Sequence, residues 1–178
     1  FMELIRMIIK IVGCVVVIVS STFLGYTLAG ECARRTKQLR VLQGMFQILE
    51  NEIGYLYSLL IDAFEKVCKS SKDEVGCVFR DTVKKLKEGS LDAGTAWEES
   101  VDGNIGKTAL NEEDKEILIS FGKMLGNSDM EGQLKNIKLT IERLKIQEKK
   151  AEESRKKNQA MYRSLGVLGG IAVVIVLI

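Results

Sequence analysis

The chain has 178 residues, with 26 Lys and Arg against 24 Asp and Glu, and it contains neither histidine nor proline. The missing histidine removes the commonest general base, the Ser/His and Cys/His nucleophile pairs and the commonest metal ligand. We therefore expect no catalytic residue, metal or cofactor, and no small-molecule substrate. The missing proline favours long helices, because proline is the strongest helix breaker.

The first predicted element is an apolar helix over residues 11–30, which carry no charge and are bracketed by Lys10 and Glu31. Twenty helical residues span about 30 Å, the thickness of the hydrocarbon core of a bilayer. A secretory signal peptide is the alternative, but its apolar core is shorter and ends at a small-residue cleavage site. The pattern favours a retained transmembrane helix, preceded by a short extracytoplasmic N-terminus at residues 1–10.

From Leu39 the apolar residues recur at intervals of three and four, which is typical of an amphipathic helix. The stripe fits one long helix, or two helices that meet between Gly54 and Ser58, with Ser58 as the cap of the second. It consists of Leu39, Leu42, Phe46, Leu49, Ile53, Leu56, Leu60, Phe64 and Val67.

Two further helices are expected before residue 103. The first covers residues 73–88 and ends before Gly89, and the second is a short helix capped by Ser90 that carries Trp97 and Val101. Residues 103–110 are expected to form a loop.

The last two helices of the central region begin at predicted caps. Asn111 caps a helix that opens with three acids and ends at Gly126, and Asp129 caps the final helix. The apolar stripe of the final helix fades after Ile146, so residues 148–158 are expected to be a solvated stalk. The fold class is therefore all-α: a bundle of about five to six helices flanked by N- and C-terminal transmembrane helices.

The C-terminal apolar run covers residues 165–178, and Met161 and Tyr162 extend it toward the bundle. We expect residues 161–178 to form a second transmembrane helix, with a buried terminal core helix as the alternative. Small residues at four-residue spacing allow close helix packing in lipid. The candidate transmembrane packing residues are Ser21, Gly25, Ala29, Gly166 and Gly170.

The cations predict the topology, because cytoplasmic flanks of membrane helices carry the excess of Lys and Arg. Only Arg6 and Lys10 precede the first run, whereas both runs are flanked by basic residues on the side of the centre. Residues 31–160 are therefore expected to form a cytoplasmic helical bundle held against membrane lipid. The candidate membrane-surface residues are Arg34, Arg35, Lys37, Arg155, Lys156, Lys157 and Arg163.

Acidic residues concentrate between Glu88 and Glu116, where nine acids stand against two lysines. This stretch is a candidate docking face for a partner, and the alternative is a surface that only keeps the protein soluble. A nucleic-acid partner is not expected, because the basic region contains a single aromatic residue, Tyr162. The candidate docking residues are Glu98, Glu99, Glu112, Glu113, Asp114 and Glu116.

The four cysteines, Cys14, Cys32, Cys68 and Cys77, form no C-x-x-C pair. This spacing indicates free thiols in a reducing compartment, with a Cys68–Cys77 disulfide as the alternative.

Several segments resemble the stage III sporulation protein AB family of spore-forming Firmicutes, in matching order along nearly the whole chain. They are QLRVLQ at 38–43, EIGY at 52–55, TAWEES at 95–100, FGKMLG at 121–126 and KNQAMYRSLG at 157–166. One departure lies at residues 55–60, where some relatives have a Tyr-Gly-x-Thr-Pro-Leu turn.

The resemblance implies a role in the channel that links mother cell and forespore, as a platform similar to the inner-membrane platform protein of type II secretion and type IV pilus systems. The expected location is the mother-cell membrane. The implied partners are other stage III sporulation channel proteins, including the cytoplasmic ATPase, stage III sporulation protein AA. A second copy of the chain is a further candidate partner, as a homo-oligomer. The alternative function is a membrane-anchored helical signalling or sensor module.

Overall fold

The computed structural model describes residues 2–56, 59–89, 91–126 and 129–177, with side chains described for most of 30–158 and for a few positions outside that range. The described residues form helices joined by short connections, without strands, which confirms the predicted all-α class. The elements are α1 (Met2–Gly54), α2 (Leu60–Ser70), α3 (Gly76–Glu88), α4 (Ala93–Asn104), the 3-10 helix η1 (Ile105–Lys107), α5 (Glu112–Gly122) and α6 (Met130–Leu177).

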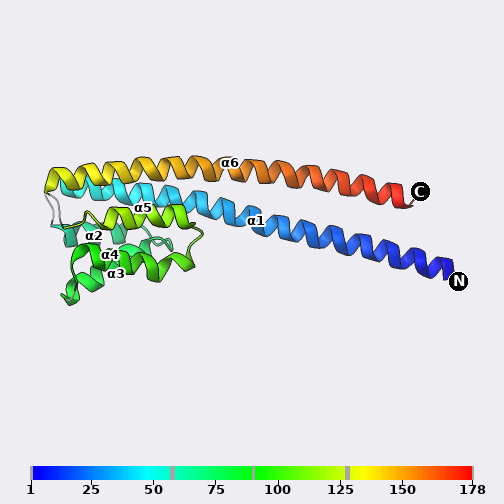
Figure 1. Ribbon diagram of the computed structural model, residues 1–178, viewed down its shortest axis with the longest axis horizontal. Helices are drawn as coiled ribbons and strands as arrows, with labels where there is room; N and C mark the ends of the chain where they lie inside the picture. The colour runs from blue at the N-terminus through cyan, green and yellow to red at the C-terminus, as the bar shows by residue number, and fades with distance from the viewer. Residues whose placement is uncertain (1, 57–58, 90, 127–128, 178) are drawn as a thin grey trace. The chain divides into compact units, whose positions relative to one another are not determined.

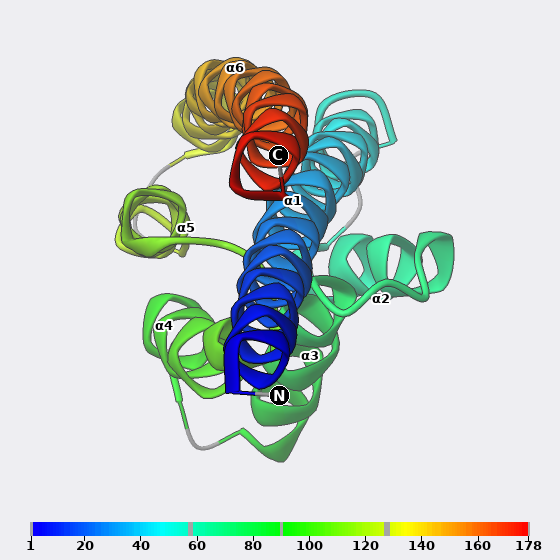
Figure 2. The ribbon, with the colours of Figure 1, turned by 90° about the vertical axis from the view of Figure 1, so that its right-hand side faces the viewer.

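The chain divides into two compact units. One contains the terminal segments, residues 1–33 and 152–178, which belong to α1 and α6. The other contains residues 34–151 and is the helical domain described below. Within it, the four short helices lie along the C-terminal part of α1 (Figure 1), and α5 lies between α4 and α6 (Figure 2).

The first amphipathic stripe belongs to two helices, since α1 ends at Gly54 and α2 begins at Leu60. The stripe residues from Leu39 to Ile53 are buried, whereas Leu56 is 60% exposed because it lies in the connection and not on a helix. The predicted cap Ser58 lies outside the described residues, and the residue before α2 is Leu59, which makes no side-chain cap.

Three predicted helix boundaries need correction. The helix expected over residues 73–88 begins at Gly76, whereas its end before Gly89, whose φ of 71° suits glycine, is as predicted. The helix expected to end at Gly126 ends at Gly122. The fourth helix is capped by Asp92, whose side chain accepts a hydrogen bond from the Thr95 backbone N–H. The predicted cap Ser90 lies outside the described residues.

The core is a cluster of five aromatic rings, each from a different helix of α1 to α5. Ring centroids lie 4.8 to 6.1 Å apart, mostly in edge-to-face geometry. Each such pair contributes about 0.5–1.5 kcal/mol beyond the burial of its area. The rings are those of Phe46, Phe64, Phe79, Trp97 and Phe121, and all are essentially inaccessible to solvent.

α6 keeps one buried face further along the chain than its apolar stripe predicts. Ile137, Ile141 and Leu144 are buried as expected, and the same face continues through Gln147 and Ala151, which are 7% and 2% exposed. Ile146 instead is 59% exposed. The expected solvated stalk is therefore packed on one side as far as Ala151, because a polar residue and a small residue complete the stripe.

Candidate functional site

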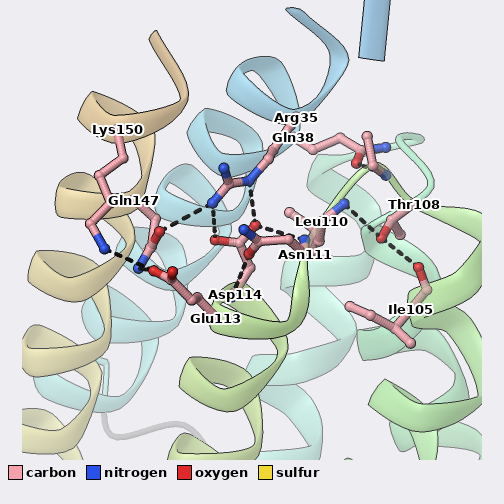
Figure 3. A network of polar contacts seen from close by, with 11 residues as sticks. Arg35, Gln38, Ile105, Thr108, Leu110, Asn111, Glu113, Asp114, Gln147 and Lys150 are labelled. Atoms are coloured by element: carbon pink, nitrogen blue, oxygen red, sulfur yellow. Dashed lines mark hydrogen bonds and ion pairs between the residues drawn. The ribbon is translucent and has the colours of Figure 1, made fainter. Parts of the chain in front are cut away.

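The candidate site is a polar junction at the N-terminus of α5, where this helix meets α1 and α6 (Figure 3). It begins with a capping box. The Asn111 side chain accepts a hydrogen bond from the Asp114 backbone N–H at 3.0 Å, and the Asp114 carboxylate accepts one from the Asn111 backbone N–H, also at 3.0 Å. Two otherwise unpaired donors of the first turn are satisfied in this way, so the predicted cap Asn111 is confirmed.

Asp114 also binds Arg35 of α1 through two parallel hydrogen bonds. Arg35 Nε lies 2.7 Å from Oδ2 and Nη2 lies 2.9 Å from Oδ1. The Asp114 side chain is fully buried and that of Arg35 is 17% exposed. A buried carboxylate needs such a partner, because removing one member of a buried pair leaves an uncompensated charge.

This geometry corrects two predictions from the sequence. Asp114 is not displayed on a docking face, and Arg35 does not lie free at a membrane surface, because each satisfies the other inside the domain. All three residues at 112–114 are acidic, so the sequence pattern does not show which of them faces inward. The capping-box spacing from Asn111 to Asp114 was the available signal.

Glu113, one residue earlier, faces α6. Its carboxylate accepts hydrogen bonds from Lys150 Nζ at 2.8 Å and from Gln147 Nε2 at 2.9 Å. These two bonds, Lys150 first, together with the charge of Lys150, hold the pKa of Glu113 below its ordinary value. Gln147 Oε1 in turn accepts from Arg35 Nη2 at 3.1 Å, so one glutamine side chain joins both ion pairs.

A second contact ties α1 to α6 at Glu148, the residue after Gln147. The Glu148 carboxylate accepts from Arg40 Nε at 2.6 Å and from Gln43 Nε2 at 2.8 Å. The partners lie more than one hundred positions apart in the chain. No local pattern in the sequence indicates such a pairing.

The chain between α4 and α5 is fixed to α1 by backbone contacts. Gln38 Oε1 accepts from the Ala109 backbone N–H at 2.7 Å, and Arg34 Nη2 donates to the Lys107 carbonyl at 2.7 Å. Thr108 closes the turn by donating its hydroxyl to the Ile105 carbonyl at 2.7 Å. The expected loop at residues 103–110 is thus shorter than predicted, since α4 reaches Asn104 and η1 follows.

The other predicted docking residues lie on α4 and α5. Glu98 is half-buried, and Glu99 forms an ion pair with Lys85 at 2.5 Å. Glu112 and Glu116 are exposed, and neither forms an ion pair with a residue that the structure describes. Glu116 borders a groove of about 450 Å³ between α5 and α6, together with Ile117, Arg143 and Ile146.

The predicted membrane-surface residues fall into both units. Arg34 pairs with Glu74 at 2.9 Å, and Lys37, which is 72% exposed, pairs with Asp73 at 3.1 Å. In the terminal unit, Arg155 pairs with Glu152 at 2.7 Å, and the adjacent lysines are exposed. The side chain of Arg163 lies outside the described residues, as do those of the packing residues Ser21, Gly25, Ala29, Gly166 and Gly170.

Within the described part of the chain, no helix combines the length and the apolar character that crossing a membrane requires. The same residues contain no group of three or more His, Cys, Asp or Glu side chains able to hold a metal ion. Cys68 and Cys77 are both free thiols, and burial raises the pKa of the Cys68 thiol. The alternative disulfide between them is therefore wrong. Cys14 and Cys32 lie outside the described side chains.

The fold and the junction define an all-α domain in which α5 is joined to α1 by the buried pair Arg35–Asp114 and to α6 by the exposed pair Glu113–Lys150. Residues 10–178 match the family described as stage III sporulation protein AB. The chain is also 34% identical over 169 residues to stage III sporulation protein AB of Bacillus subtilis (strain 168), covering 95% of this chain and 99% of that protein.

A solved structure supports the same assignment. A chain described as stage III sporulation protein AB matches with a TM-score of 0.65 and 33% identity, over 70% of this chain and 98% of that one. The chain therefore belongs to the stage III sporulation protein AB family, and its relatives are named as sporulation proteins. The resemblance found in the sequence is confirmed.

Proposed function

We propose that the protein is a non-enzymatic, membrane-anchored platform of the channel complex between mother cell and forespore, and that it couples a cytoplasmic ATPase to this channel. In this role it lies in the mother-cell membrane with residues 31–160 in the cytoplasm. The ATPase partner is stage III sporulation protein AA, and the other partners are further stage III sporulation channel proteins.

The observation that carries the proposal is the position of α5. Its first turn binds α1 through Asp114 and α6 through Glu113, while Glu112 and Glu116 stay exposed on the same helix. A partner that binds the exposed acids would therefore act on a helix already fixed to both long helices. A coupling element needs such a connection, since a displacement is transmitted only through contacts that hold its parts together.

The ends of the chain support the membrane part of the proposal. α1 and α6 each include one of the two apolar runs of the sequence, and the cations beside these runs would lie near anionic headgroups. The relatives named as sporulation proteins support the biological process and a non-enzymatic role.

The test reverses the exposed acids and keeps the buried junction intact. Glu112→Lys combined with Glu116→Lys is expected to abolish most ATPase capture by the full chain in a pull-down from mild detergent. Reversing Glu113 or Asp114 is unsuitable, because Asp114 compensates the charge of Arg35 inside the domain and Glu113 is already bound to Lys150 of α6. Glu131→Lys is the matched control, since Glu131 is an exposed acid in the first turn of α6.

The outcomes separate docking from mere solubility. Loss of capture in the double variant but not in Glu131→Lys supports a docking face on α5. Equal capture by all three proteins rejects that face and leaves the acids as a solubilising surface. The fluorescence of Trp97, the single tryptophan, reports that the variants are folded, because its ring lies in the aromatic core.

A further inference from the structure

A polar hollow lies where the beginning of the helical domain in α1 meets the connection between α2 and α3. Its volume is about 350 Å³, and both walls lie within the unit of residues 34–151. The lining residues are Arg34, Lys37 and Gln38 of α1, and Lys72, Asp73 and Glu74 of the connection. The α1 residues follow the first apolar run closely in the sequence. The residues of the connection are distant from it in the sequence and are brought beside α1 by the fold.

The hollow carries an excess of positive charge. Its three cations stand against two carboxylates, and Glu74 is occupied by Arg34 at 2.9 Å and by Gln38 at 2.6 Å. Lys72 is exposed and forms no ion pair or hydrogen bond with any residue that the structure describes. Lys37 pairs with Asp73 at 3.1 Å, its single ion pair among the described residues, and is largely exposed. These two lysines can therefore bind an anion.

The wall also contains an acceptor. Asp73 Oδ1 is buried and accepts no hydrogen bond within the described part of the chain, although Oδ2 of the same carboxylate pairs with Lys37. Buried polar atoms are nearly always paired, because leaving one unpaired costs free energy. A simple anion does not meet this need, since it brings no donor to the carboxylate. A ligand that combines an anionic group with a nearby hydroxyl does.

We propose that this hollow binds the headgroup of an anionic phospholipid whose phosphodiester carries a hydroxylated alcohol, as in phosphatidylglycerol. The phosphodiester lies between Lys37 and Lys72, and a glycerol hydroxyl donates to Asp73 Oδ1. The net positive charge favours this headgroup over the zwitterionic ethanolamine headgroup. The inference rests on the proposed membrane anchoring: Arg34 follows the apolar run by four residues, which is about 6 Å along a helix.

The experiment uses the full chain in nanodiscs of phosphatidylcholine that contain labelled phosphatidylglycerol bearing a photoreactive group. Lys72→Ala is expected to reduce labelling of the protein about fivefold, the contribution of one cation near an anionic surface. Lys84→Ala is the matched control, because Lys84 is an exposed lysine of α3 without a described ion pair. It is expected to be labelled like the wild type.

Asp73→Ala tests the acceptor separately, because alanine has no side-chain oxygen. Wild-type protein is expected to prefer phosphatidylglycerol to phosphatidic acid, whose headgroup lacks the glycerol hydroxyls, and Asp73→Ala is expected to lose this preference. Wild-type labelling of Lys72→Ala, or an unchanged preference in Asp73→Ala, overturns the site. Trp97 fluorescence confirms that each variant is folded.

Two further arms separate this inference from its basis. A chain that is retained in carbonate-washed membranes, but whose Lys72→Ala variant is labelled normally, overturns the headgroup site alone. A chain that the wash removes overturns the membrane anchoring of the proposed function. Glycerophosphoglycerol at the concentration of the lipid is expected not to compete, and full competition would reassign the site to a soluble phosphodiester.

Discussion

Gly122 of α5 lies against the indole ring of Trp97, so close that a methyl group added at Gly122 would be 2.5 Å from Trp97 Cδ1. The same indole donates its Nε1–H to the Leu118 carbonyl one turn earlier at 2.7 Å. The indole ring therefore lies directly against the backbone of Gly122, which has no side chain, and is held in place by its hydrogen bond to Leu118. This arrangement lets α4 and α5 pack closely.

Gly122→Ala is expected to destabilise the protein, because Trp97 is fully buried and cannot move aside without disturbing the aromatic core. Overpacking of this kind costs about 1–3 kcal/mol in the free energy of unfolding. The measurement is denaturant unfolding of the full chain in mild detergent, followed by Trp97 fluorescence. Gly103→Ala is the control: nothing lies within 4 Å of its added methyl, and it is expected to stabilise α4 by about 0.5–1 kcal/mol.

Asp114→Ala is expected to cost about 3–5 kcal/mol, because it removes the carboxylate that compensates the charge of Arg35 and also removes half of the capping box. The double variant Arg35→Met with Asp114→Asn is expected to lose less than the sum of its single variants. Asparagine keeps an acceptor for the Asn111 backbone N–H, and methionine removes the unpaired charge. Strictly additive losses in the same unfolding assay would show that the two residues do not interact.

How much of this could be predicted from the sequence depends on the range of the interaction. Trp97, Phe121 and the buried stripes follow from helical periodicity, and the cap at Asn111 follows from its side chain and the acids behind it. The pairing of Asp114 with Arg35 crosses 79 positions and depends on how α5 is rotated against α1. Periodicity cannot show this rotation for a helix whose first turn consists of acids.

The same reason explains the errors at Gln147 and Ala151. A polar and a small residue do not extend an apolar stripe in the sequence, yet both face the domain because the bonds of Gln147 to Arg35 and Glu113 replace apolar contact. Glu112 and Glu116 are exposed, and the sequence predicts this exposure only because both belong to a charged run.

The ion pair of Glu113 predicts a loss of stability in acid. The pKa of Glu113 is lowered in the folded protein, mainly by its hydrogen bond from Lys150. Its stabilising effect is therefore fully present above the ordinary pKa of a glutamate and is lost as the pH falls through the lowered folded value. Because Glu113 lies at the surface, the effect is small and decreases with salt.

Glu113→Gln is expected to have a lower unfolding midpoint than the wild type at neutral pH, and the difference is expected to vanish in acid. Glu116→Gln corrects for the loss of one exposed charge, since Glu116 forms no described ion pair. The measurement is the unfolding midpoint as a function of pH for the wild type and for Glu113→Gln. A difference between the two midpoints that stays constant as the pH falls, after this correction, would contradict the role of the Lys150 contact.

The proposed topology predicts which side of the membrane the helical domain faces. Gly103 is exposed near the C-terminal end of α4, so a reporter can be inserted beside it at the surface of the domain, and Trp97 fluorescence reports that the fusion is folded. A fluorescent protein that matures only in the cytoplasm is expected to be bright at this position, and alkaline phosphatase, which is active only outside, is expected to be silent. This expectation follows from the excess of Lys and Arg beside the two apolar runs, which marks the cytoplasmic side. The reverse pattern would place residues 31–160 outside the cell, where a cytoplasmic ATPase cannot reach α5, and would reject the proposed coupling.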